Sequence, residues 1–291
     1  MRTVAFLVVP LGWLAAGCTA VLSPGEDQCE VADDCAARGF ADAVCENNVC
    51  LAATEVVVDP VWGCLGHVDE PTPDPTKTVE LNVRLAFATD SEPLSEDAVV
   101  DVCDKLDIMC TGMSAEFFPK GLHPDADGRV KLTLRQGFDG FVRVTHETMV
   151  DSRVYVGRPI VEVPKVGEIQ LLRPTEYEFL AAIAEKPVDP MRGTAILLAV
   201  DCSGDAAGGV RFECPNADED SQEFYLINQG PVVPPTATAT DVDGFGGYFN
   251  LPPSAAVVRA FRDEDDTYIG ESSFQVLENT LSYVLVLPTP K

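Results

Sequence analysis

The strongest constraint on the fold is an alternation of apolar and polar residues with a period of two. It is clearest where Val79, Leu81, Val83 and Leu85 take every second position and polar residues fill the places between them. Because successive side chains of a strand point to opposite faces of its sheet, this spacing puts the apolar side chains on one face. The sequence therefore predicts a half-buried β-strand here.

Short segments with strand-like composition recur along the rest of the chain, separated by runs rich in Gly, Asp and Pro. We expect strands at 99–103, 129–134, 140–146, 154–156, 168–172, 194–200, 209–213, 224–226, 247–250, 257–261, 268–269, 273–276 and 281–287. Short strands at this spacing are typical of antiparallel β-sandwiches. The predicted fold class is mainly β: two Ig-like or transthyretin-like antiparallel β-sandwiches joined by a short helix, after a disulfide-rich N-terminal segment.

One helix, at 175–186, is expected between the two β bodies. Thr175 can cap its start, its apolar residues fall on one face, and Pro187 stops it. The predicted organisation is a lipoprotein signal peptide at 1–17, a cysteine-rich neck at 18–70, a Pro-rich linker at 71–78, a first sandwich at 79–174, a connecting helix at 175–188 and a second sandwich at 189–291.

The N-terminal segment has the layout of an export signal. A positive start at Arg2 precedes an apolar stretch at 4–13, which is far shorter than the roughly 20 residues that a bilayer-spanning helix needs. The run from Leu14 through small residues to Cys18 resembles the lipobox of bacterial lipoproteins, with Ala15 where the usual pattern has Leu. The resemblance implies that the Cys18 thiol carries the acyl group, such as palmitate, and that the peptide before it is removed. The alternative is an ordinary signal peptide that contains a cysteine.

The charge of the chain limits its partners. A net charge of -27 argues against nucleic acid, whose phosphates need clustered Lys and Arg, and against electrostatic docking on anionic lipids. The expected partners are a membrane through the lipid anchor and an envelope protein or a polysaccharide, with no nucleic acid. In well-studied lipoproteins, Asp after the acylated cysteine favours the inner membrane; here Thr19 follows Cys18. The resemblance therefore implies an exported protein anchored at the outer membrane, on its periplasmic face or at the cell surface.

The cysteines of an exported chain predict disulfide bonds, because the compartment outside the inner membrane is oxidising. The disulfide candidates are Cys29, Cys35, Cys45, Cys50, Cys103, Cys110, Cys202 and Cys214. We expect Cys103 to pair with Cys110 and Cys202 with Cys214, and the first four cysteines to form two crossed or nested bridges of open connectivity. Cys64 is then left over: it is either free and buried beside Trp62, or it displaces one of the local partners. Zinc at the first four cysteines is disfavoured, since no CxxC spacing occurs.

The segment 193–288 resembles a carboxypeptidase regulatory-like domain, a transthyretin-type β-sandwich. The resemblance is carried by Asp201-Cys202-Ser-Gly204, by Thr240-Asp241-Val-Asp-Gly244 before Tyr248-Phe249, and by the bend at 250–253. The segment 79–174 is similar and has its own D-x-D-G turn at Asp125. The resemblance implies a structural or binding module without peptidase chemistry, and a fold of this kind does not by itself give a function.

The sequence offers little catalytic chemistry. His67, His123 and His146 are the three histidines, and no motif places one beside a nucleophile, so we expect no catalytic residue, no metal and no cofactor. The two D-x-D-G segments are interpreted as turns rather than calcium sites, because Asp and Gly are what a tight turn needs. The weak cation-site candidates are Asp263, Glu264, Asp265 and Asp266, at an expected hairpin tip.

These features predict a non-catalytic, lipid-anchored structural or binding module of the envelope or cell surface. The alternative is a carbohydrate- or protein-ligand receptor with a defined pocket, and an enzyme comes third. A deep aromatic cleft between the two sandwiches would favour the receptor, whereas smooth polar faces would favour the structural role.

Overall fold

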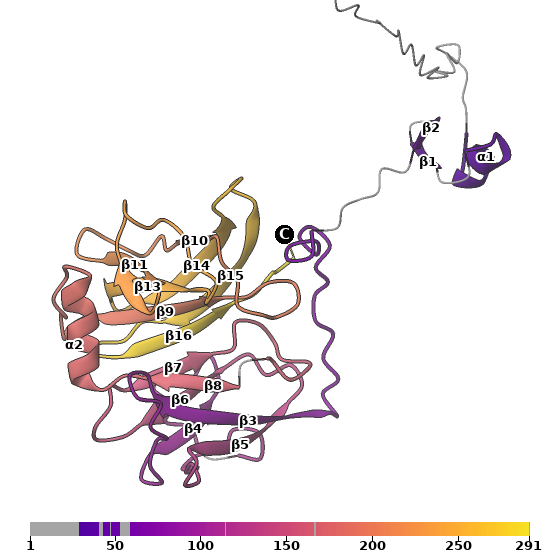
Figure 1. Cartoon of the computed structure of the whole chain (residues 1–291). Coiled ribbons are helices and arrows are strands. Elements are labelled where there is room, and N and C mark those ends of the chain that lie inside the picture. Colours follow the sequence, from indigo (N-terminus) through magenta and orange to yellow (C-terminus); the bar gives the residue numbers. More distant parts are fainter. Residues whose placement is uncertain are drawn as a thin grey trace, which may run out of the picture. The chain divides into compact units, whose positions relative to one another are not determined.

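The computed structural model describes residues 29–40, 43–46, 48–52, 59–113, 115–165 and 167–290. The chain divides into two units, Met1–Val58 and Asp59–Lys291, and each is described by itself (Figure 1). Within these described ranges, no helix is long and apolar enough to cross a membrane.

The first unit is held together by two crossed disulfide bonds. Its elements are α1 (Ala32–Ala37), β1 (Ala43–Glu46) and β2 (Val49–Ala52). Cys29 is bonded to Cys45, and Cys35 is bonded to Cys50, which settles the order that the sequence left open. The two strands form an antiparallel hairpin in which Cys45 lies opposite Cys50. In so small a unit, cross-links take over the stabilising role that a hydrophobic core has in a larger one.

The second unit is mainly β, which confirms the predicted fold class. The strands of its first half are β3 (Thr78–Phe87), β4 (Val99–Cys103), β5 (Arg129–Arg135), β6 (Phe141–Thr145), β7 (Ser152–Tyr155) and β8 (Glu168–Leu171). Helix α2 (Pro174–Ile183) follows. The strands of the second half are β9 (Gly193–Ala199), β10 (Val210–Glu213), β11 (Gln222–Ile227), β12 (Gly230–Val232), β13 (Phe245–Leu251), β14 (Ala255–Arg262), β15 (Tyr268–Gln275) and β16 (Leu281–Val286).

One eight-stranded sheet runs through both halves of this unit, in the order β12-β11-β13-β9-β16-β7-β6-β4. The last strand, β16, lies between β9 and β7 and is parallel to both (Figure 1). Two three-stranded sheets complete the sandwiches, β5-β3-β8 in the first half and β10-β14-β15 in the second. The two sandwiches are therefore joined by a shared sheet as well as by the helix, and not all pairings are antiparallel.

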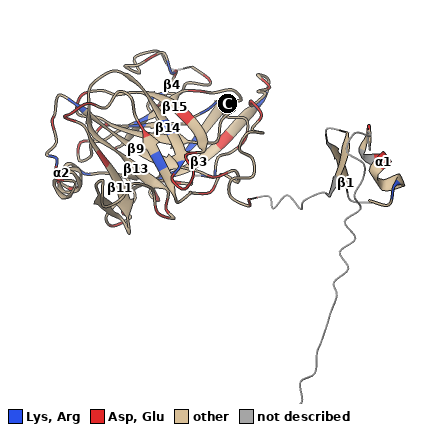
Figure 2. Cartoon of the chain, turned by 90° about the horizontal axis from the view of Figure 1, so that it is seen from above, with Lys and Arg blue, Asp and Glu red and all other residues tan. Residues whose placement is uncertain are grey.

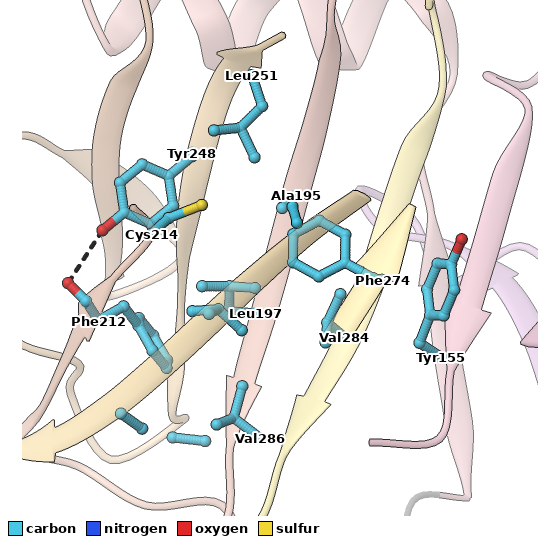
Figure 3. Packing of buried hydrophobic residues seen from close by; sticks show 14 of the residues in the cluster. Tyr155, Ala195, Leu197, Phe212, Cys214, Tyr248, Leu251, Phe274, Val284 and Val286 are labelled. Carbon is cyan, nitrogen blue, oxygen red and sulfur yellow. Dashed lines mark hydrogen bonds between the residues drawn. The ribbon is translucent and has the colours of Figure 1, made fainter. Parts of the chain in front are cut away.

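The two sandwiches bury opposite faces of the shared sheet. Val284 and Tyr155 are register partners, so their side chains lie on the same face, and both belong to the apolar cluster that includes β10, β14 and β15 residues (Figure 3). Their chain neighbours Tyr283 and Val154 are also register partners and point to the other face. There they pack against the cluster that contains the apolar residues of β3 and β5.

Helix α2 covers one end of this second face. Its start is capped at Arg173, whose backbone N–H donates to the Glu176 carboxylate at 2.8 Å, so the predicted cap at Thr175 is wrong by two residues. Tyr177 is buried against the sheet, and its hydroxyl lies 2.7 Å from that of Thr194 on β9. The helix therefore helps to hold the strands in place, which fits its expected position between the two β bodies.

The segment 59–66, which the sequence assigns to the neck, packs on the second sandwich. Trp62 belongs to the apolar cluster of that sandwich. The backbone N–H of Cys202 donates to the carbonyl of Val61 at 3.1 Å, and Cys64 is bonded to Cys202. We call residues 59–69 the strap.

The predicted pairing of Cys202 with Cys214 is wrong, and Cys64 is not the leftover thiol. Cys202 follows β9 and faces the strap, whereas Cys214 comes directly after β10 and is a free, buried thiol. The predicted bond between Cys103 and Cys110 is present.

Candidate functional site

A cavity of about 700 Å³ lies between the two sheets of the first sandwich and opens toward the end of β16. It exists because a three-stranded sheet cannot cover the whole second face of an eight-stranded one. Helix α2 covers one end of that face, and the irregular segment 156–165 borders the other. The space left between them falls in the size range of small-molecule sites.

The interior of the cavity is aliphatic. The shared sheet contributes Val142, Val154 and Leu285, and the residues directly after β7 and β16 contribute Val156 and Leu287. The β5-β3-β8 sheet contributes Leu81, Val83, Leu85, Val130, Leu132 and Ile169. Such a lining attracts apolar ligand surface and offers no hydrogen bond to a sugar ring.

Tyr155 is the one aromatic residue among the lining residues described, but its ring faces the other side of the sheet. Its ring centroid lies 5.2 Å from that of Phe141 and 6.1 Å from that of Phe274, within the apolar cluster of the second sandwich (Figure 3). Its hydroxyl donates to the carbonyl of Gln275, and burial raises the pKa of the phenol. The aromatic cleft that would favour a carbohydrate receptor is therefore not what lines this cavity.

The mouth of the cavity is formed by the strap, by segment 156–165 and by the loop after β9. Segment 156–165 packs closely on the C-terminal end of the second sandwich. Gly157 has a positive φ, and its backbone lies so near the carbonyl of Leu285 that a Cβ would not fit there. Lys165 forms an ion pair with Asp205 at 2.8 Å, which joins the segment to the loop after β9. The disulfide at Cys64 holds the strap to the same loop.

The mouth carries several charged groups, among them the cations of Arg158 and Lys165. The guanidinium of Arg158, which is half-buried, donates to the carbonyl of Pro288 at 3.3 Å. No carboxylate among the described residues lies within ion-pair distance of it. The chain has 47 acidic and 20 basic residues, and its acidic residues are spread over the second unit (Figure 2). At this mouth Arg158 differs from Lys165, which is paired with Asp205.

The acidic groups at the mouth differ in whether their carboxylates already accept hydrogen bonds from the chain. The Asp201 carboxylate already accepts hydrogen bonds from the backbone N–H groups of Ser203 and Asp205, at 2.7 and 2.9 Å. Asp69 and Glu162 are exposed to solvent. The exposed His67 also lines the opening.

The predicted lipidation site, Cys18, lies outside the described residues. The weak cation-site candidates Asp263, Glu264, Asp265 and Asp266 sit at the β14–β15 turn and beside arginines. Arg262 is 3.2 Å from Glu264 and 3.6 Å from Asp265, and Arg211 is 2.8 Å from Asp266. Within the part of the chain that the structure describes, these carboxylates do not converge into a three-ligand cluster. The arginines supply the positive charge that a cation would otherwise bring.

Cys29, Cys35 and Cys50 do bring their sulfur atoms close together. All three are disulfide-bonded, and a disulfide sulfur is not the thiolate that binds zinc. The four neck cysteines therefore serve as cross-links.

The two D-x-D-G segments form turns, as their composition predicts. The Asp125 carboxylate accepts the backbone N–H groups of Asp127 and Arg129 at 3.0 and 2.8 Å. The Asp241 carboxylate accepts those of Asp243 and Asn228 at 3.0 and 2.9 Å. In each turn the aspartate oxygens are taken up by the chain's own backbone.

A serine and a histidine that the sequence did not connect lie within hydrogen-bond distance. Ser95 Oγ is 3.0 Å from His146 Nε2. The other ring nitrogen, Nδ1, faces Thr148, whose hydroxyl lies 2.9 Å away and whose backbone N–H lies 3.2 Å away. Among the described residues, no carboxylate bonds to this nitrogen as it does in a catalytic triad.

No protein-family model matches this chain, and no curated protein matches it. The resemblances to lipoproteins and to carboxypeptidase regulatory-like domains therefore stay predictions.

Several solved structures are similar at low identity. The Bacillus anthracis TIE protein is 12% identical over 73% of this chain, with a TM-score of 0.22, and this chain spans only 34% of its length. The shaft pilin SpaA from Lactobacillus rhamnosus GG is 11% identical, with 74% of this chain and 98% of that chain covered and a TM-score of 0.22. A streptococcal ancillary pilin is 14% identical, with 75% and 64% covered and a TM-score of 0.22. At such scores the chains do not superpose as wholes.

Proposed function

We propose that this chain is a non-catalytic module of a bacterial envelope, exported and held at the membrane surface by a lipid on Cys18. The observation that carries the proposal is the disulfide framework of the described chain. Crossed bridges close the first unit, and within the second unit a bridge over a separation of 138 residues ties the strap to the second sandwich. Such cross-links persist in oxidising compartments outside the cytoplasm, which supports export.

The shared sheet supports a role as a rigid structural or binding body. Its central strands are covered on both faces, so the two sandwiches cannot hinge about a flexible linker. The surroundings of His146 support the non-catalytic assignment, because its Nδ1 faces Thr148 and not the carboxylate that orients a catalytic histidine.

A second candidate function is a receptor with a defined pocket, and the cavity of about 700 Å³ favours it. Its aliphatic lining favours an apolar ligand over a carbohydrate. Trp62, the tryptophan that a sugar could have stacked on, is only 9% exposed and packs in the core.

The anchor is tested by the variant Cys18→Ser, expressed in a Gram-negative host. We expect it to lose palmitate labelling and to leave the membrane fraction, because the thiol is the proposed acylation site. The matched control is Cys214→Ala, which removes a free thiol that is buried in the second sandwich and should label and fractionate like the unchanged protein. If Cys18→Ser stays with the membranes and keeps its label, the lipid-anchor proposal fails.

A further inference from the structure

We infer that the cavity in the first sandwich binds a single linear aliphatic chain that ends in a carboxylate. This inference deepens the receptor function proposed above and rests on it, but it does not depend on acylation at Cys18. Three observations carry it: the two aliphatic walls of the cavity, its route to solvent through a polar mouth, and an arginine at that mouth that no described carboxylate pairs with.

The shape of the cavity favours a chain over a bulky ring system. The cavity is a gap between two facing sheets, so two opposed layers of side chains bound it. Its two walls are formed by methyl-bearing side chains, such as that of Val83 on β3 and those of Val154 and Leu285 on the shared sheet. A gap with two aliphatic walls matches an alkyl chain.

The lining excludes a polar occupant of the interior. Leu285 lies near the end of β16 and Leu287 directly after that strand, beside the opening, and both remain half-buried although their neighbours are aliphatic. When the apolar surface of a ligand replaces solvent beside half-buried aliphatic side chains, the complex is stabilised.

The mouth selects the head group. Lys165 is neutralised by Asp205, whereas Arg158 donates one hydrogen bond to a backbone carbonyl and keeps further N–H donors for a ligand. A guanidinium matches a carboxylate in geometry and charge. The exposed carboxylates of Asp69 and Glu162 at the same mouth disfavour a head group with several negative charges.

The experiment uses the full-length chain with Cys18→Ser, so that no acyl group of its own competes for the cavity. Binding is measured by calorimetry with straight-chain carboxylates from octanoate to palmitate, with the alcohols of the same lengths, and with alkyltrimethylammonium ions of the same lengths. We expect affinity for the carboxylates to rise about fourfold with each added methylene until the cavity is full. We expect the cations to bind more weakly than the carboxylates.

Two kinds of variant locate the ligand. Arg158→Gln should weaken binding of the carboxylates by about tenfold and leave the alcohols unchanged. Arg259→Gln is the control, since Arg259 lies on β14 and does not line the cavity. Val156→Trp and Leu287→Trp, each checked for a native circular dichroism spectrum, should fill the space and abolish binding of both series.

Several outcomes would overturn the inference. They are an affinity that does not depend on chain length, an equal loss for carboxylates and alcohols in Arg158→Gln, or unchanged binding in both folded tryptophan variants. If a polysaccharide fragment or an apolar peptide binds and the tryptophan variants abolish that binding, the receptor function stands and the ligand class is wrong. If none of these compounds binds the folded protein, the receptor function fails together with the inference.

Discussion

At the scale of single residues, burial changes how readily an acidic group ionises. Glu223 on β11 accepts a hydrogen bond from the hydroxyl of Tyr225 at 2.6 Å, and Tyr225 is fully buried. Burial raises the pKa of Glu223 above the ordinary glutamate value, and the nearby Arg211 lowers it only in part. The charged form of this carboxyl group is therefore disfavoured in the folded state.

This shift predicts a pH-dependent effect of Glu223→Gln. Because the folded-state pKa is raised, the native protein holds a proton that the unfolded chain has already lost, so stability falls as pH rises from the ordinary glutamate pKa through the raised one. Glutamine stays neutral at every pH, so the variant has no buried carboxyl group whose ionisation costs stability. We expect the variant to gain stability over the unchanged protein in urea unfolding at about pH 7 and to lose that gain at about pH 4. Glu278→Gln, at an exposed position, is the control; the same gain at both pH values would contradict the explanation.

Residue spacing predicted some cysteine pairs and not others. Cys103 and Cys110 are seven residues apart, and a loop that short closes at little entropic cost, so the local pair could be expected. Cys64 and Cys202 are 138 residues apart, and nothing in the sequence around them marks the partner. The D-x-D-G turns were predictable for the opposite reason, since their hydrogen bonds lie within or beside the turn itself.

At the scale of elements, period-two alternation located most strands. β4 has the bounds that the sequence predicts, and β3 extends only one or two residues beyond the alternating run. The segments 268–269 and 273–276 are parts of one strand, β15. Strand β12 was not predicted, because Gly230 and Pro231 are both unfavourable in strands and Pro is tolerated at the edge position that β12 takes.

The strap yields a prediction about disulfide stability. The bond between Cys64 and Cys202 closes a loop of 138 residues, which in the chain-entropy model stabilises the fold by about 5 kcal/mol. We expect the double variant Cys64→Ala/Cys202→Ala to lower the free energy of unfolding of the second unit by several kcal/mol. The measurement is denaturant unfolding without reductant, with peptide mapping to identify the cross-linked pair.

The control for the strap is Cys214→Ala, which removes a buried thiol but no cross-link. It should cost much less than the double variant. Equal losses in the two proteins would mean that core packing around each cysteine, and not the cross-link, sets the stability.

At the scale of the whole molecule, the shared sheet is what the sequence could not predict. Alternation tells which face of a strand is buried, but not which strand lies beside it. β7 and β16 are parallel neighbours although most of the second sandwich lies between them in the chain. The cavity was hidden for a related reason: its lining residues are Val, Leu and Ile, and in sequence they cannot be told from residues that fill a core.

This architecture predicts that the second sandwich does not fold alone. A fragment of residues 189–291 would leave β16 as an edge strand with unpaired backbone groups, since β7 supplies its neighbour from Ser152 to Tyr155. It would also expose the side chain of Tyr283. Because it lacks helix α2, it would lose the hydrogen bond between the hydroxyl groups of Tyr177 and Thr194. We expect the fragment to aggregate or to lack a cooperative thermal transition, whereas residues 59–291 unfold in a single transition. If the fragment is soluble, monomeric and cooperative, the second sandwich folds without the pairing of β16 with β7, and the prediction is wrong.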